Sequence, residues 1–117
     1  MNHIELGKWG EDFAMKILQE KGYKILGKNY YFHKWELDII SMKEDVLVIV
    51  EVKTRFTDEF GEPWQSVTKK KQKQIYKVAN AYILEKDLQF NTRFDVFSII
   101  KNDHFMRWEH IEDAFSP

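Results

Sequence analysis

The stretch ELDIISMKEDVLVIVEVKT, residues 36–54, decides the fold of this chain. Residues 36–42 and 46–54 have the apolar, β-branched composition of strands, and the polar turn Lys43-Glu44-Asp45 between them predicts an antiparallel hairpin. Val46–Val50 is apolar on both faces, which is typical of a central strand. The hairpin therefore predicts the middle of a sheet that is covered on both sides.

The sequence on either side of the hairpin predicts two helices. Residues 4–21 place apolar side chains on one helical face, and Gly22 supplies a stop for that helix. Residues 68–85 predict a second helix, with Ser66 or Thr68 as its N-cap.

Three further strands complete the predicted order α-β-β-β-α-β-β, which is that of an α/β domain with a mixed five-stranded sheet flanked by helices. A chain of 117 residues fits one domain, residues 1–117. The remaining predicted segments are strands at residues 23–32, 92–101 and 104–110, a loop at 55–67 and a short helical turn at 111–115.

The composition excludes several classes of protein. There is no cysteine, so disulfides and thiolate metal sites are excluded. No apolar run is long enough to cross a bilayer, and the first residues, MNHIELGKWGED, lack the apolar core of a signal peptide, so we expect a cytoplasmic protein without a membrane partner. The formal net charge of −1 means that binding to nucleic acid would need a local basic patch.

Charged residues interrupt the predicted apolar surfaces. Glu11 lies about 60° from Ala14 on the helical wheel and faces inward, unless its carboxylate reaches solvent at the edge of the apolar stripe. Gly7 and Gly10 share that face and allow another backbone or a ligand to approach.

Two predicted strands carry further charges. Glu36 and Asp38 lie two residues apart and share a face, which suits either a solvent-facing edge or a pair of ligands. Glu51 and Lys53 share a face at the end of the most apolar strand. They form either a structural ion pair or a metal ligand beside a catalytic lysine.

The register of the hairpin decides whether these carboxylates meet. In one register Asp38 faces Glu51 and Glu36 faces Lys53, whereas a slip by one residue turns Asp38 to the wrong face. A metal site requires the first register, or a bulge that restores it. Two carboxylates about 4 Å apart repel by roughly 4 kcal/mol at an effective dielectric of about 20, so the cluster needs a proton or a cation. Oxygen ligands without His or Cys suit Mg²⁺ or Mn²⁺.

The second predicted helix begins with the basic run Lys69-Lys70-Lys71-Gln72-Lys73. Lys71 lies about 40° from Ile75 on the helical wheel, so it points inward with Gln72 beside it. An inward lysine at a helix start is a reasonable phosphate contact. The other lysines of this helix suit a solvated face: Lys69, Lys70, Lys73 and Lys77.

The histidines and tryptophans give weaker signals. The histidines show no ligand spacing and are interpreted as surface or packing residues: His3, His33, His104 and His110. The tryptophans suit core or rim packing, with base stacking as the alternative: Trp9, Trp35, Trp64 and Trp108.

The ordered set of Glu11, Asp38 and Glu51-Val52-Lys53 resembles the core of the PD-(D/E)XK nuclease superfamily. More specifically, the chain is similar to the YraN-like family of uncharacterised bacterial proteins, which are related to archaeal-type Holliday junction resolvases. The matching stretches lie within residues 7–97 and are GKWGEDFA, ELDIIS, VIVEVKTR, SVTKKKQKQI and RFDV.

This resemblance implies a restriction endonuclease-like fold and Mg²⁺- or Mn²⁺-dependent hydrolysis of phosphodiester bonds in nucleic acid, with branched or structured DNA favoured over RNA. It implies metal binding by Asp38, Glu51, Glu11 and the Val52 carbonyl, with Glu36 as an accessory ligand and Lys53 as a catalytic residue. Nucleic-acid contacts are expected from Lys71, Gln72, Arg55 and Lys69. By analogy with resolvases, which act as dimers, it also implies a homodimer.

Two other classes of function stay open on the sequence. A nucleic-acid-binding module could keep the nuclease fold and cleave little or nothing. A structural or partner-binding domain would show no effect of metal on its thermal stability.

Overall fold

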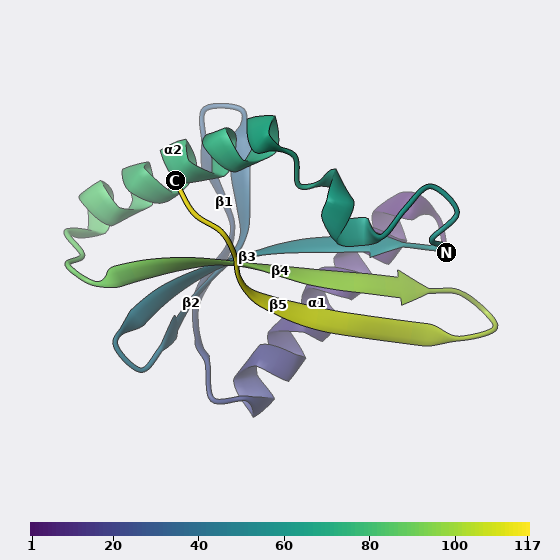
Figure 1. Ribbon diagram of the computed structural model, residues 1–117. Coiled ribbons are helices and arrows are strands. Elements are labelled where there is room, and N and C mark those ends of the chain that lie inside the picture. Colours follow the sequence, from purple (N-terminus) through teal and green to yellow (C-terminus); the bar gives the residue numbers. More distant parts are fainter.

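The computed structural model describes residues 1–117 and confirms an α/β protein with a mixed five-stranded sheet and two helices (Figure 1). The strands lie in the sheet in chain order, and only β3 and β4 are parallel. The elements are α1 (His3–Glu20), β1 (Lys24–Phe32), β2 (Trp35–Lys43), β3 (Val46–Arg55), the short 3₁₀ helix η1 (Pro63–Ser66), α2 (Lys69–Lys86), β4 (Asn91–Lys101) and β5 (Met106–Phe115).

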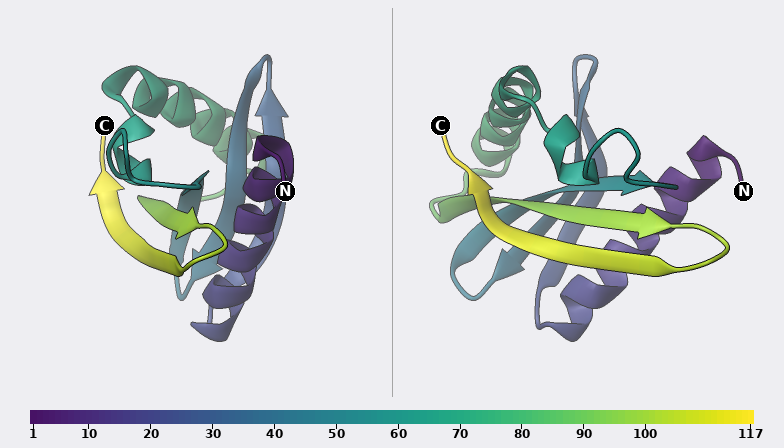
Figure 2. Two further views of the ribbon diagram at one scale, coloured as in Figure 1. Left: turned by 90° about the vertical axis from the view of Figure 1, so that its right-hand side faces the viewer. Right: turned by 45° about the vertical axis from the view of Figure 1, so that its right-hand side comes forward.

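The parallel pair β3–β4 explains why α2 lies over one face of the sheet. Parallel neighbouring strands need a crossover connection, and η1 and α2 form it. η1 lies within the predicted loop at residues 55–67, and α2 follows that loop. Helix α2 lies over one face and α1 over the other (Figures 1 and 2). Alternate residues of β3 enter the two cores, with Leu47 and Ile49 on the α2 side and Val48 and Val50 on the α1 side. The predicted burial of this strand on both faces is confirmed.

Helix α1 begins and ends at its capping residues. The Asn2 side chain accepts a hydrogen bond from the Glu5 amide at 2.8 Å, and the Glu5 carboxylate accepts one from the Asn2 amide at 3.0 Å. This capping box satisfies two amides that the helix leaves free. Gly22 follows the helix with a positive φ of 90°, as expected for a stop. The buried stripe held against the sheet is Leu6, Gly10, Ala14 and Leu18.

Helix α2 starts after Thr68, whose hydroxyl accepts a hydrogen bond from the Lys71 amide at 3.2 Å. Thr68 rather than Ser66 is therefore the N-cap. The buried stripe of α2 consists of Ile75, Val78, Ala79 and Tyr82. It fixes the rotation of the helix, so that Lys71 faces the sheet as predicted.

The prediction of a helical turn at residues 111–115 is wrong, because β5 continues as a strand to Phe115. The pairing of β4 with β5 shifts register at Asp95. There the Asp95 carboxylate accepts a hydrogen bond from the amide of Asp113, which has a positive φ of 51°, at 3.0 Å. A side chain thus bridges an irregular strand pair at a place where polar residues suggest a turn.

Helix α1 lies in close contact with β3 at Gly10. A Cβ on Gly10 would overlap the Thr54 hydroxyl oxygen and lie 3.0 Å from Thr54 Cβ. A Cβ on Gly7 would meet nothing within 4 Å. The close approach that the glycines predict therefore occurs at Gly10 and not at Gly7.

We expect Gly10→Ala to lower the free energy of unfolding by about 1–3 kcal/mol, because the helix must move away from Thr54. Gly7→Ala is the matched control, and it should raise stability by up to about 1 kcal/mol through its better helix propensity. Urea denaturation of the two variants measures both effects. Equal stabilisation by both substitutions would contradict the close contact.

Candidate functional site

The acidic site begins where β2 and β3 separate. In the observed register Ile39 pairs with Val50 and Ile40 with Ile49, so the next position places Asp38 opposite Glu51. The register that a metal site requires is thus the one the hairpin adopts. Beyond Ile39 and Val50, the last paired residues of the two strands, the Asp38 carboxylate accepts a hydrogen bond from the Val52 amide at 2.8 Å. The side chain of Asp38 continues the link between the strands after their backbones diverge.

Asp38 and Glu51 are buried carboxyl groups, with 7% and 2% of their surfaces exposed. Burial, followed by the negative charge of Glu51, raises the pKa of Asp38 well above its usual value. Burial also raises the pKa of Glu51, although the positive charges of Lys71 and Lys53 oppose this rise. Two such groups are both ionised only when additional positive charge lies between or beside them.

Glu51 has an unmatched oxygen atom. Its Oε1 lies 3.5 Å from the Lys71 ammonium, whereas its Oε2 is buried without a hydrogen-bond partner. Buried carboxylate oxygens are normally paired, because leaving one desolvated and unpaired is costly. The site can therefore accept a proton or a cation at this atom.

Glu11 and Glu36 reach the same site from α1 and β2. Their carboxylate oxygens and that of Asp38 lie within 4.8 Å of one another. The Asn29 side-chain amide donates to Glu11 at 3.0 Å and to Glu36 at 3.3 Å. Burial raises the pKa of Glu11, and the hydrogen bond from Asn29 counteracts part of that rise. Asn29 therefore holds two acidic side chains together.

The structure groups the predicted acidic residues differently from the expectation in one respect. Glu11 and Asp38 converge as predicted, but their third neighbour is Glu36, which was expected only as an accessory residue. Glu51 lies outside this group of three, beside Asp38, because its carboxylate contacts Lys71. Asp38 thus links two groups of acidic side chains.

The predicted catalytic lysine, Lys53, and the residues predicted to contact nucleic acid have different positions. Lys53 is half-buried and forms no ion pair, and Lys71 points inward onto Glu51. The Gln72 amide donates to the Val67 carbonyl at 3.1 Å and so holds the turn before α2. Arg55 is exposed and donates to the Ser66 hydroxyl at 3.2 Å, while Lys69 is exposed on the first turn of α2.

Comparison with known proteins gives the family. The model of the uncharacterised protein family UPF0102 matches residues 10–99, which include every acidic residue of the site. The chain belongs to UPF0102. It is 46% identical to a UPF0102 protein of Flavobacterium psychrophilum over 97% of this chain and 95% of that protein. It is 43% identical to one of Dictyoglomus turgidum, over 98% of this chain and 100% of that protein.

The helices of this UPF0102 chain carry no membrane span, since neither is long and apolar enough to cross a bilayer.

The sequence also contains a weak signal for the role of Asn29 that the prediction missed. Asparagine is rare in strands, yet Asn29 lies inside β1 with a positive φ of 50°. Such a residue is worth examining as a local irregularity, and here it directs its amide toward Glu11 and Glu36.

The UPF0102 chain also contains a buried charge network around Asp95 that sequence reasoning did not find. Arg93 donates to both Asp95 oxygens, at 2.9 and 2.8 Å, and His110 lies 2.7 Å from Oδ2. The interpretation of His110 as a surface or packing residue omitted this contact. Burial would raise the pKa of Asp95, but the hydrogen bonds from His110, Arg93 and the Asp113 amide lower it below its usual value.

Asp95→Asn is expected to lower the free energy of unfolding at neutral pH by about 3–5 kcal/mol, because it removes the buried carboxylate that both Arg93 and His110 contact. Arg93 then keeps only the exposed Glu112 as an ion-pair partner. A carboxyl whose pKa is lowered in the folded state stabilises above its unfolded pKa and loses this contribution as pH falls through its folded pKa. Urea denaturation at pH 7 and at about pH 3 should therefore show a smaller difference between the two proteins in acid. A difference independent of pH would contradict this role of the carboxylate.

Proposed function

We propose that this protein is a divalent-metal-dependent nuclease of the PD-(D/E)XK type that hydrolyses phosphodiester bonds, in DNA rather than RNA. The observation that carries the proposal is the buried Glu51 Oε2 without a partner, next to the buried Asp38 carboxyl. The ion pair with Lys71 occupies only Oε1 of Glu51 and leaves Oε2 unaccounted for. A cation bound between the two carboxyl groups would match the unpaired atom and offset their repulsion.

The donor atoms of the site fit Mg²⁺ or Mn²⁺. All four acidic side chains offer hard oxygen ligands, and no histidine or cysteine lies among them. Asp38 and Glu51 would hold the metal together with the Val52 carbonyl, and Glu11 and Glu36 would bind it directly or through water. The metal, when bound, supplies charge that polarises the scissile phosphate and lowers the pKa of a bound water.

The lysines of the site would act on the phosphate and on the attacking water. Lys53 lies two residues beyond Glu51 on the same face of β3 and forms no ion pair, so its ammonium is free to orient water and to stabilise negative charge on the phosphate. Lys71 and the first turn of α2 add positive potential beside Glu51. Arg55 and Lys69, both exposed, would contact neighbouring phosphates of the strand.

Metal binding alone should be measurable as thermal stabilisation. A metal at a hundredfold excess over its Kd is expected to stabilise the folded protein by about 2.7 kcal/mol. Thermal denaturation in MgCl₂, MnCl₂ and CaCl₂, compared with NaCl at equal ionic strength, tests this. Identical melting temperatures in all four salts would contradict the proposed metal site.

Cleavage and binding assays test the activity itself. The substrates are duplex, single-stranded, flap and four-way DNA together with RNA, incubated with Mg²⁺ or Mn²⁺. A gel shift with the same substrates in Ca²⁺ measures binding separately. Cleavage of at least one DNA substrate is expected. Binding in Ca²⁺ without cleavage in the other ions would instead identify a nucleic-acid-binding module.

A further inference from the structure

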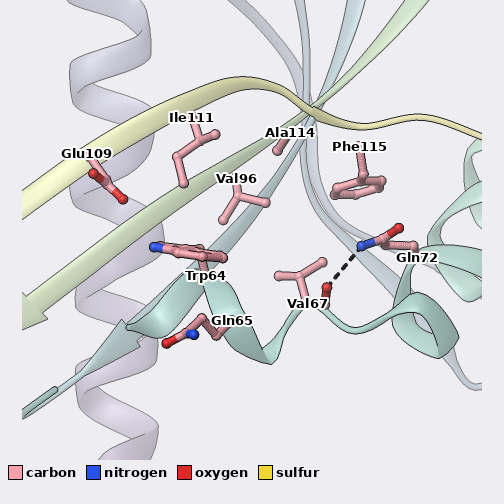
Figure 3. A pocket seen from close by; sticks show the side chains of 9 residues that line it. All are labelled: Trp64, Gln65, Val67, Gln72, Val96, Glu109, Ile111, Ala114 and Phe115. Atoms are coloured by element: carbon pink, nitrogen blue, oxygen red, sulfur yellow. Dashed lines mark hydrogen bonds between the residues drawn. The ribbon is translucent and has the colours of Figure 1, made fainter. Parts of the chain in front are cut away.

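A groove with a volume of about 590 Å³ opens between η1, the start of α2 and β5 (Figure 3). Its floor is apolar and includes Val96 and Ile111, and its walls include Trp64 and Phe115. Glu109 brings a carboxylate to one end of it. The activity proposed above assigns nothing to this groove.

The floor of the groove continues the row of residues that contains the acidic site. Glu51 of β3 is the direct neighbour of Val96 in β4, and Val96 is the neighbour of Ile111 in β5. Neighbouring strands lie about 4.8 Å apart, so the groove begins one strand away from Glu51. A nucleotide whose phosphate lies at the acidic site can place its base in the groove without spanning any other surface feature.

The indole of Trp64 is presented on a rigid support. Its amide donates to the Ser98 hydroxyl at 3.2 Å, and Ser98 is the β4 neighbour of Lys53. Glu62, at the N-cap of η1, is held by Arg107 at 3.0 Å. The Trp64 side chain nevertheless keeps 41% of its surface exposed. An exposed indole on a fixed backbone is suited to stacking on a planar ligand.

The polar groups of the groove favour a base over an apolar ligand. The exposed side chain of Glu109 makes no hydrogen bond or ion pair within the protein, so its carboxylate is available to accept from ring N–H and amino groups. An aliphatic chain offers no such donor, and an acidic ligand would be repelled. A nucleobase has both a flat face for Trp64 and N–H donors on its edge.

We propose that the groove receives one unstacked nucleobase, held against Trp64 with its edge toward Glu109, next to the phosphate at the acidic site. The preferred substrates would then contain unpaired nucleotides, as in single strands and flaps, rather than a continuous duplex. This inference rests on the proposed nuclease function. It adds to that function a base-binding subsite and a substrate class.

Binding measured in Ca²⁺ by fluorescence anisotropy tests the subsite. The probes are labelled single-stranded, flap and blunt duplex DNA of equal length. Trp64→Ala should weaken single-strand and flap binding by about 5- to 100-fold, as expected for the loss of one base stack, and leave duplex binding unchanged. Trp64→Phe should restore most of the affinity. Phe105→Ala is the control, because Phe105 is a comparably exposed aromatic residue outside the groove.

An abasic scan of the flap locates the base that enters the groove. One abasic position should weaken binding to the wild-type protein as much as Trp64→Ala does, and the two changes should not add. Unchanged single-strand and flap binding by Trp64→Ala, with metal-induced stabilisation and cleavage retained, would overturn the subsite and leave the nuclease proposal standing. If the wild-type protein bound none of the DNA probes, both the base-binding subsite and the nuclease proposal would be contradicted.

Discussion

Lys53→Ala is expected to reduce Mn²⁺-dependent cleavage by at least about 100-fold while the protein keeps its fold. A single positioned group that stabilises developing charge contributes about this much to catalysis. Lys53 is half-buried, carries no ion pair and lies two residues from Glu51 on the same strand, so its loss removes charge from the reaction site and little from the core. Single-turnover cleavage of the best substrate from the panel measures the effect.

The matched control is Lys73→Ala, because Lys73 is an exposed lysine of α2. Its removal changes the net charge equally and should alter cleavage by less than about twofold. The metal-induced rise in melting temperature should survive in Lys53→Ala, since Lys53 offers no ligand atom to a cation. Cleavage at the wild-type rate in Lys53→Ala would remove this residue from the mechanism.

The parts of the site that could be predicted are those fixed by the pattern of apolar residues. The apolar pattern predicts the hairpin but does not choose its register, because β3 is buried on both faces and a slip by one residue would only exchange Leu47 and Ile49 for Val48 and Val50 in the α2-side core. The inward position of Lys71, by contrast, follows from Ile75, one turn further along a helix that is apolar on one face only. The burial of apolar residues on one face fixes the orientation of the helix, and this orientation also sets the direction in which its charged side chains point.

The parts that could not be predicted depend on contacts between elements distant in sequence. Whether Glu36 or Glu51 is the nearer neighbour of Glu11 depends on the twist of β2 and on the side-chain conformations, neither of which leaves a periodic pattern. The Asp95 network joins β4 to β5 through a bulge whose position the alternation of residues does not reveal.

Asp38→Asn is expected to abolish both cleavage and metal-induced stabilisation while leaving the metal-free protein more stable by about 1–2 kcal/mol. The amide oxygen of the substituted side chain can still accept a hydrogen bond from the Val52 amide, and the change removes a buried charge that faces Glu51 and Glu11. The substitution therefore separates function from stability. Urea denaturation with EDTA and with Mn²⁺, alongside the cleavage assay, measures the two effects.

The pH dependence of this stabilisation follows from the direction of the pKa shift. Because the pKa of Asp38 is raised in the folded protein, its ionisation destabilises the fold above that pKa, and this cost disappears as pH falls below the unfolded value of about 4. The advantage of Asp38→Asn should thus be largest at neutral pH and vanish in acid. Asp45→Asn, at an exposed turn position, should show neither effect. The contradicting result is a metal-free Asp38→Asn protein that is less stable than wild type at neutral pH. The Asp38 carboxylate would then stabilise the fold, and there would be no electrostatic cost for a cation to relieve.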